Sequence, residues 1–523
     1  MFLRTTSSVL AVMALSAPAL ADVTPAEVWQ NWVDYYKANG YSVTEGSREQ
    51  AGEVLMLRDV VIAYAAPEDD TRVEFRTPEI VLTGTGDGRV RTTMAERSPA
   101  TARFRDSDGE EITLNGTLTA RDAEIVSSGT PGDMTHETRA GELALTLDSV
   151  RTAEGTRTVP ASLRLLNATG RQQITDTDTM RFDAMFAADR AEFAVAYADP
   201  DTAEDPRSLN IASVLNGLQA ASAGTLPKGV DMAGDMAGAL RAGADVTATV
   251  SARQGSLNMD AAGRDDQGQE EAVRVGSTLE GFELAVALGP DGMKYQGALD
   301  SSSTDMAGSG LPAPISYTVT EGTFDMQVPV LKSDRPAPFK FAYSIGELTL
   351  ADSVWDLFDS ARVLPRDPAH LDIDLTGLVR ITMDLFDPAL MSDSGNENSA
   401  AAGQDAPDAG EEMDNPFEPT EVAINKFAIS ALGASVDASG ELKVPEGGSA
   451  DQPVGAVRAR LDGVNGLIDR LVQMGVIAPD EVAGYRLMLA MFARPAPEGD
   501  DALVAEFEFR ENGQVFANGQ QVK

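Results

Sequence analysis

The chain has no cysteine and only two histidines among its 523 residues. The absence of cysteine excludes disulfides, thiolate nucleophiles and cysteine–metal sites together. With only His136 and His370 available, a transition-metal centre or a histidine-dependent catalytic triad is disfavoured. The sequence also lacks a G-x-S-x-G elbow, a P-loop and a G-x-G-x-x-G turn. We therefore expect no catalytic residues, no cofactor and no metal site, and a protein that is not an enzyme.

Basic residues are scarce as well: 41 Lys and Arg stand against 82 Asp and Glu, a net charge of −41. This charge repels phosphate backbones and anionic lipid surfaces, so nucleic acid is not an expected partner. With so many acids, an acidic pair like that of a glycoside hydrolase is compatible with the sequence but not indicated by it. The apolar share of 43% is ordinary and allows a large core.

Long apolar runs are missing, and the one near the start is short. Residues 1–21 combine Arg4, an apolar stretch from Val9 to Leu15, and the small-x-small sequence that ends at Ala21. This is the pattern of a secretory signal peptide, and its apolar run is far shorter than the ~20 residues that a membrane span needs. We expect cleavage after Ala21 and a periplasmic protein without a transmembrane anchor.

What the sequence does contain is period-2 alternation. From Leu371 to Leu385 the odd positions are apolar apart from Gly377, which predicts a long strand with a bulge at the glycine. No helical pattern separates the earlier strands, so parallel βαβ units are not expected. We predict a mainly β (α+β) fold with long, antiparallel, curved sheets. The clearer runs in the first half are Val54–Tyr64, Arg72–Thr83, Ile112–Ala120, Leu143–Leu147, Leu163–Leu166 and Phe193–Tyr197. Hairpin turns are predicted at Asp87-Gly88, Asp108-Gly109, Asn115-Gly116, Asn512-Gly513 and Asn518-Gly519.

Helical signals are few. Thr24-Pro25-Ala26-Glu27 predicts a capped N-terminal helix. Helical spacing predicts a mid-chain pair, Ser208–Ala221 and Val230–Leu240, and a C-terminal pair whose methionines we interpret as core. The C-terminal pair is Gly466–Met474 and Asp480–Ala493, and a further short helix is expected at Val354–Arg362.

These signals divide the chain into successive regions. Residues 392–420 are rich in Ser, Asn, Gly and acids, a composition typical of a disordered loop. The predicted order is a signal peptide at 1–21, a helix and β region at 22–205, a helical interlude at 206–243, a second β region at 244–391, the acidic loop at 392–420, and a β/α/β region at 421–523.

One segment also resembles a known family. The similarity lies in Trp355-Asp356-Leu357-Phe358, in Leu364-Pro365-Arg366-Asp367-Pro368-Ala369-His370-Leu371 and in Asp374-Leu375-Thr376-Gly377. These runs are similar to the alphaproteobacterial family of domain of unknown function 2125. The resemblance implies an envelope location and a β-rich fold, distantly similar to the AsmA-like periplasmic β-groove proteins. It brings no catalytic residues.

Two functional hypotheses follow, and an acidic-pair glycan hydrolase is a third. In the first, a curved sheet keeps part of its apolar face open as a groove for an apolar ligand such as lipid. In the second, helices or a second layer close that face, and the protein is a structural or protein-binding envelope module. Lipid or an envelope protein is thus the expected partner, and the sequence does not determine the oligomeric state.

Overall fold

The structure is a computed structural model that describes residues 22–38, 40–66, 71–106, 109–198, 207–230, 235–264, 268–387, 416–445, 447–448 and 451–523. The predicted signal peptide lies outside these residues, as does residue 108 of one predicted turn. Most of the predicted acidic loop lies outside them too. Its last residues, 417–420, begin strand β20, so the loop ends earlier than predicted.

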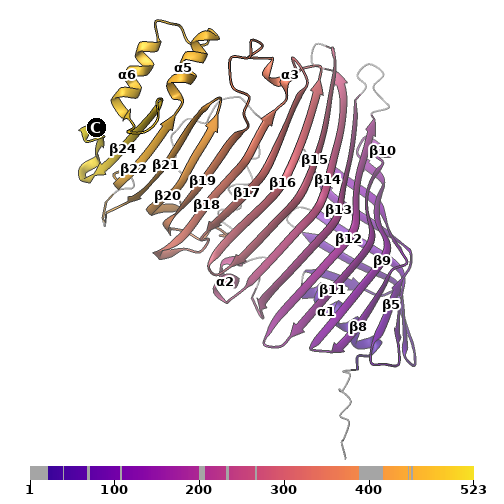
Figure 1. The fold of residues 1–523 in the computed structure, drawn as a ribbon. Helices are drawn as coiled ribbons and strands as arrows, with labels where there is room; N and C mark the ends of the chain where they lie inside the picture. The colour runs from indigo at the N-terminus through magenta and orange to yellow at the C-terminus, as the bar shows by residue number, and fades with distance from the viewer. Residues whose placement is uncertain are drawn as a thin grey trace, which may run out of the picture.

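The strands form one antiparallel sheet of 26 strands, which confirms the mainly β prediction (Figure 1). Almost every strand pairs with its neighbours along the chain, so the sheet is a continuous meander. The strands are β1 Tyr41–Thr44, β2 Ser47–Ala51, β3 Val54–Ala66, β4 Thr71–Gly84, β5 Val90–Met94, β6 Arg97–Arg105, β7 Glu111–Arg121, β8 Glu124–Thr130, β9 Asp133–Thr152, β10 Gly155–Arg157, β11 Ala161–Asp176, β12 Thr179–Ala198, β13 Ser208–Pro227, β14 Asp245–Arg264, β15 Glu270–Gly289, β16 Gly292–Gly308, β17 Ile315–Val328, β18 Ser333–Leu350, β19 Ala369–Ile381, β20 Phe417–Ala431, β21 Ala434–Lys443, β22 Val454–Asp462, β23 Arg494–Pro495, β24 Ala502–Arg510, β25 Gln514–Ala517 and β26 Gln520–Gln521.

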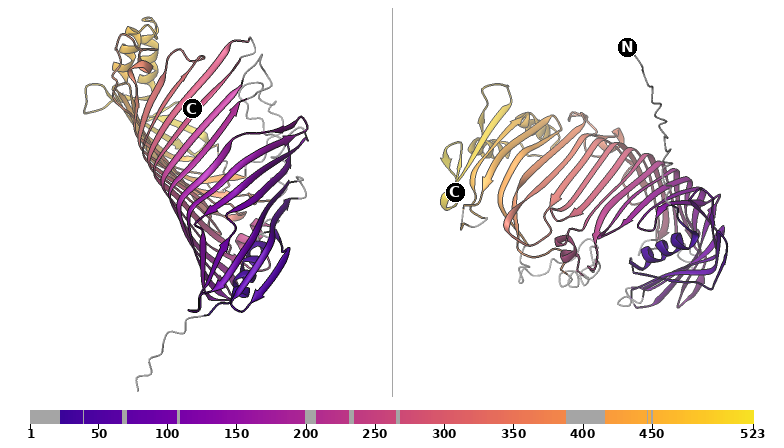
Figure 2. Two further views of the ribbon diagram at one scale, coloured as in Figure 1. Left: turned by 90° about the vertical axis from the view of Figure 1, so that its right-hand side faces the viewer. Right: turned by 90° about the horizontal axis from the view of Figure 1, so that it is seen from below.

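The sheet curves into a long trough, and its N-terminal end curls around helix α1, Pro25–Ala38 (Figure 2, right). The predicted capping box is present: the Glu27 carboxylate accepts the Thr24 N–H at 2.9 Å, and the Thr24 hydroxyl accepts the Glu27 N–H at 3.3 Å. Helix α1 buries Val28, Trp29 and Val33 against β3, β4, β5 and β9, in the larger of the two buried apolar clusters. It therefore closes one end of the trough.

The predicted mid-chain helical pair is wrong. Ser208–Ala221 lies in strand β13, which pairs along its length with β12 and β14, so the sheet continues without a boundary. Of the second predicted helix, Met236–Arg241 forms α2, capped by the Asp235 carboxylate, which accepts the Gly238 N–H. Ala239 and Leu240 of α2 pack with Leu288 and Met293 at the lower ends of β15 and β16.

The segment before β19 is less helical than predicted. Helix α3 spans only Asp352–Trp355, and the chain continues in turns to the prolines. Strand β19 ends at Ile381, four residues before the predicted end, and its irregular pairing with β20 falls on either side of Gly377. Asn115-Gly116 is not a turn but lies inside β7, whereas Asp87-Gly88 connects β4 to β5 as predicted.

The C-terminal helices occur where they were predicted. Helix α5, Val464–Gln473, and helix α6, Val482–Phe492, connect β22 to β23 and β24. They project from one end of these strands (Figure 1). The Asp501 carboxylate accepts the N–H groups of Asn465 and Gly466 and so caps α5.

Candidate functional site

The two faces of the sheet differ in chemistry from one end to the other. We call the face that carries α1 and α2 the trough face and the opposite one the outer face. One row of partnered residues on the trough face crosses fourteen strands from β9 to β24, on the order of 60 Å at about 4.8 Å per strand. Its members are His136, Gln172, Ala184, Ser222, Ala248, Val286, Tyr295, Met326, Phe341, Leu375, Ile424, Gly440, Val457 and Phe507.

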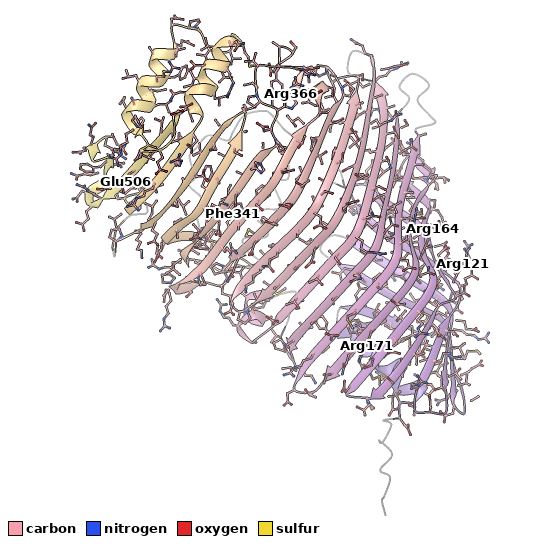
Figure 3. The ribbon with its side chains drawn as sticks, in the orientation of Figure 1. Arg121, Arg164, Arg171, Phe341, Arg366 and Glu506 are labelled. Carbon is pink, nitrogen blue, oxygen red and sulfur yellow. The ribbon has the colours of Figure 1, made fainter. Side chains whose placement is uncertain are left out.

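The first row and the adjacent row are both mainly apolar. The adjacent row consists of Thr138, Gly170, Phe186, Ala220, Val250, Leu284, Gly297, Phe324, Tyr343, Ile373, Phe427, Ala438, Ala459 and Ala505. Phe341 of the first row lies on β18, far from the end that α1 closes (Figure 3). Neighbouring rows together make a largely apolar surface along the trough, and the polar members His136, Thr138, Gln172 and Ser222 lie toward its N-terminal end.

Much of this surface is in contact with solvent. Leu163 and Phe193, partners on β11 and β12, are each 43% exposed, and Ile429 on β20 is 42% exposed. Tyr343 and Phe427 are exposed as well. Among the described residues, the buried apolar clusters lie at α1 and α2, so no layer covers the middle of the trough face.

A line of kinks shapes the trough. In β12 the trough-facing residues are Phe182 and Phe186 before the kink, but Phe193 and Val195 after it, so the alternation changes from even to odd positions. Equivalent changes occur in neighbouring strands, and we call this row the crease. Positive φ angles between 50° and 65° mark it at Asp59, Asp122, Asn167, Gly217, Gly281 and Glu321.

At the crease two consecutive residues face outward, so the outer face has one extra side chain per strand. Bending toward the trough face explains this, because the outer side of a bend is longer. The outer side chains are polar: Asn167 donates to Asp189 at 2.9 Å. Beside them runs a ladder of ion pairs, Arg121–Glu142, Glu142–Arg164 and Arg164–Glu192, at 3.0–3.5 Å. Arg121 and Arg164 lie near each other on that part of the sheet (Figure 3).

At the end closed by α1, the trough face meets an aromatic cavity of about 320 Å³ lined by Trp32, Tyr35 and Tyr36. His136 contributes to its wall and is buried. Its Nδ1 lies 2.8 Å from the Ser127 hydroxyl, and burial lowers the pKa of His136 to about 4. The imidazole is therefore neutral at pH 7.

The two histidines of the sequence do not meet. His136 lies on β9 under α1, whereas His370 is exposed at the start of β19, just after the prolines. Among the residues that the structure describes, no cluster of three or more His, Asp and Glu has the arrangement of a metal site. The alternation of apolar residues that marks the trough face can be read from the sequence only in part. Thr138, Gln172 and Ser222 occupy trough-facing positions and interrupt this alternation.

Two of the segments that carry the family resemblance, residues 355–358 and 364–368, lie in the turns before β19. We call residues 352–368 the locked turn. Buried Trp355 lies under the Arg366 guanidinium, which also bonds Asp352 and Asp356. Burial alone would raise the pKa of Asp359, but the N–H groups of Val363 and Leu364 bond its carboxylate and hold that pKa below its usual value. This arrangement fixes the turn into β19 and has no catalytic geometry.

None of the helices in the described residues is long and apolar enough to cross a membrane. No curated protein and no solved structure was found to match the chain. The likeness to AsmA-like proteins therefore stays a prediction. A family model does match, over residues 361–522, which run from the locked turn through β19 to the terminal hairpin. This match confirms the predicted resemblance for the C-terminal part of the chain, which is similar to the family described as "Uncharacterized protein conserved in bacteria (DUF2125)".

Proposed function

We propose that this protein is a non-catalytic component of the bacterial envelope that holds the hydrocarbon chains of lipids in its trough. The observation that carries the proposal is the largely apolar trough face, which crosses fourteen strands and is exposed to solvent over much of its length. Exposed apolar surfaces of this extent mark binding sites in water-soluble proteins. The signal peptide predicted at 1–21 supports a periplasmic location, where lipids in transit need protection from water.

The shape of the trough fits an elongated apolar ligand. Each methylene group moved from water to an apolar surface gains about 0.8 kcal/mol, so ten methylenes gain about 8 kcal/mol before the cost of association. A surface on the order of 60 Å long accepts such chains without a specific pocket. Aromatic and branched side chains line it, among them Phe324, Phe341 and Ile373. The charged outer face offers no comparable surface.

The alternative, a protein-binding module with a closed core, requires a cover over the trough face. The exposure of Phe193, Tyr343 and Ile429 is more consistent with an open trough. An enzyme of the acidic-pair type gains no support, since no acidic pair lines the trough rows named above.

Neighbouring residues on opposite faces provide the test. A photo-reactive benzoylphenylalanine replaces Tyr343, on the trough face, or Ala342, on the outer face of the same strand. Each variant is produced in the bacterium that makes the protein naturally, and the cells are irradiated. Covalently attached lipid is then identified by mass spectrometry. We expect lipid adducts at position 343 and far fewer at 342. Equal labelling at the two positions, or none at either, would contradict the proposal.

A further inference from the structure

Helix α6 is apolar, and yet it has no buried residue. Leu487 is 65% exposed, Met491 55% and Met488 53%, while Tyr485 and Phe492 are also exposed. The interpretation of these methionines as core is therefore wrong. In the turn before α6, Val476 is 66% exposed. We call α5, α6 and the turn between them the α5–α6 hairpin.

Helix α6 carries a single charge, and an ion pair with α5 neutralises it. Arg486 is the one charged residue among the eleven of the helix, and it bonds Asp469 of α5 at 2.6 Å. Helix α5 is anchored instead: Ile468 is buried, and Arg470 donates to the Leu432 carbonyl in the turn after β20. The sheet thus holds α5 in place, and α5 presents α6 to the surroundings.

The apolar surface of α6 is continuous with the trough. The ring of Phe492, the last residue of the helix, lies 6.3 Å from the ring of Phe507, which belongs to the trough-face row. Asn518 of the terminal hairpin donates to the Phe492 carbonyl at 2.9 Å and holds this junction. The apolar surface of α6 thus meets the trough-face row at Phe507.

The distribution of apolar residues around α6 indicates whether the helix binds a protein groove or a lipid layer. A helix that binds a protein groove carries one apolar stripe with polar residues opposite, whereas α6 is apolar on most of its circumference. A helix that is apolar on all sides belongs in an apolar medium. At eleven residues α6 is far too short to span a bilayer, so the interfacial layer is the medium that it fits.

The charged residues beside α6 indicate which kind of lipid headgroup the helix can approach. The residues that flank α6 are mainly acidic: Asp480 and Glu481 precede it, and Glu498, Asp500 and Asp501 follow it, against the single base Arg494. The acidic side chains would be repelled by anionic headgroups.

We propose that the α5–α6 hairpin is a membrane-docking element that places α6 in the interfacial layer of a zwitterionic bilayer. Docking brings the C-terminal end of the trough, opposite the end closed by α1, to the membrane. That this end admits lipid rests on the function proposed above, but docking itself does not.

Vesicle flotation of the full mature chain tests the docking. With phosphatidylcholine vesicles we expect the protein to float, and the double variant Leu487→Asp, Met491→Asp to bind at least about tenfold more weakly. The control Met185→Asp changes a residue of similar exposure on the outer face and should float like the parent. Replacing part of the lipid by phosphatidylglycerol should weaken binding. Equal flotation of all three proteins, or none, would overturn the proposal.

A second measurement does not depend on variants that carry new charges. Because the chain has no cysteine, Leu487→Cys introduces a single site for an environment-sensitive fluorophore, with Met185→Cys as the matched control. A blue shift on addition of phosphatidylcholine vesicles is expected at 487 only. A concentration-dependent blue shift without vesicles would show instead that α6 binds a second copy of the chain.

The two proposals fail separately. Loss of lipid adducts at position 343 with flotation intact would overturn the lipid-holding function alone. Absence of flotation with adducts at 343 intact would overturn the docking alone.

Discussion

The glycines at the crease tolerate substitution poorly. Gly281 has φ of +61°, and a Cβ atom built on it would lie 1.9 Å from a carboxylate oxygen of Asp300 on the next strand. At Gly217, φ is +65° and a Cβ atom would lie 2.2 Å from Arg253 Nε. Large polar side chains thus fill the space that each glycine leaves on the outer face.

Gly281→Ala should therefore destabilise β15 and β16 by about 1–3 kcal/mol, because alanine is strained at positive φ and also contacts Asp300. Gly297→Ala is the matched control: Gly297 has no positive φ, and its Cβ atom would have ordinary contacts at 3.7 Å and beyond. Hydrogen exchange of the β15–β16 amides measures the difference. Equal loss of protection in the two variants would show that the crease is not strained.

His136 makes the N-terminal end sensitive to pH. Its pKa is about 4 in the folded protein and about 6.5 in an unfolded chain, so below pH 6.5 the unfolded chain binds the proton more readily. Stability is therefore complete above pH 6.5 and falls as the pH approaches 4, by about 3 kcal/mol. We expect His136→Gln to remove this part of the pH dependence. Urea unfolding at pH 7 and pH 4.5, followed by tryptophan fluorescence, compares the two proteins, and parallel pH dependence would contradict the prediction.

The mistaken helix at Ser208–Ala221 shows why strands of this sheet are hard to predict. On β13 the trough face carries Leu209, Ile211 and Leu215 before the crease and Leu218 after it. The change of alternation at the crease puts apolar residues three, four and seven positions apart, which is the spacing of an amphipathic helix. The sequence contains no separate mark of the crease, since only some of its positions are glycine.

Other strands were found but predicted too short. Strand β9 covers twenty residues, of which only Leu143–Leu147 was predicted, because His136 and Thr138 hold trough-facing positions and hide the alternation. Strand β19, by contrast, alternates from Leu371 to Ile381 with Gly377 as the one exception, and there the prediction was close. The C-terminal helices were also placed correctly, but their packing was not, because periodicity does not tell an apolar face that is buried from one that is exposed.

Strand β19 also distinguishes an open trough from a closed core. Ile381 and Ile373 face the same side, but Ile381 is 1% exposed whereas Ile373 is only half-buried. We expect Ile381→Asp to destabilise the protein by several kcal/mol and Ile373→Asp by much less, since water reaches a carboxylate at position 373. Thermal unfolding of both variants, with Thr382→Ser as a near-neutral control, decides this. Equal costs at 373 and 381 would indicate that the trough is covered.

The meander gives the whole molecule a nearly linear pattern of contacts. Each long strand contacts the strands before and after it, and the buried clusters at α1 and α2 are separate. Proteins built in this way have stabilities that are sums of local and nearest-neighbour contributions, and their ends can open independently.

Damage to the N-terminal end should therefore remain local. Leu57 is fully buried against α1, so Leu57→Ala removes a buried side chain at a cost of about 2–5 kcal/mol. Hydrogen exchange with mass spectrometry should show lost protection in α1 and β1–β5, while the amides of β20–β24 exchange as in the parent. Loss of protection along the entire sheet would mean that the meander unfolds as one cooperative unit. Leu503→Ala on β24 is the reciprocal change, and we expect it to affect the C-terminal strands and leave α1 protected, because no described contact joins the two ends of the sheet.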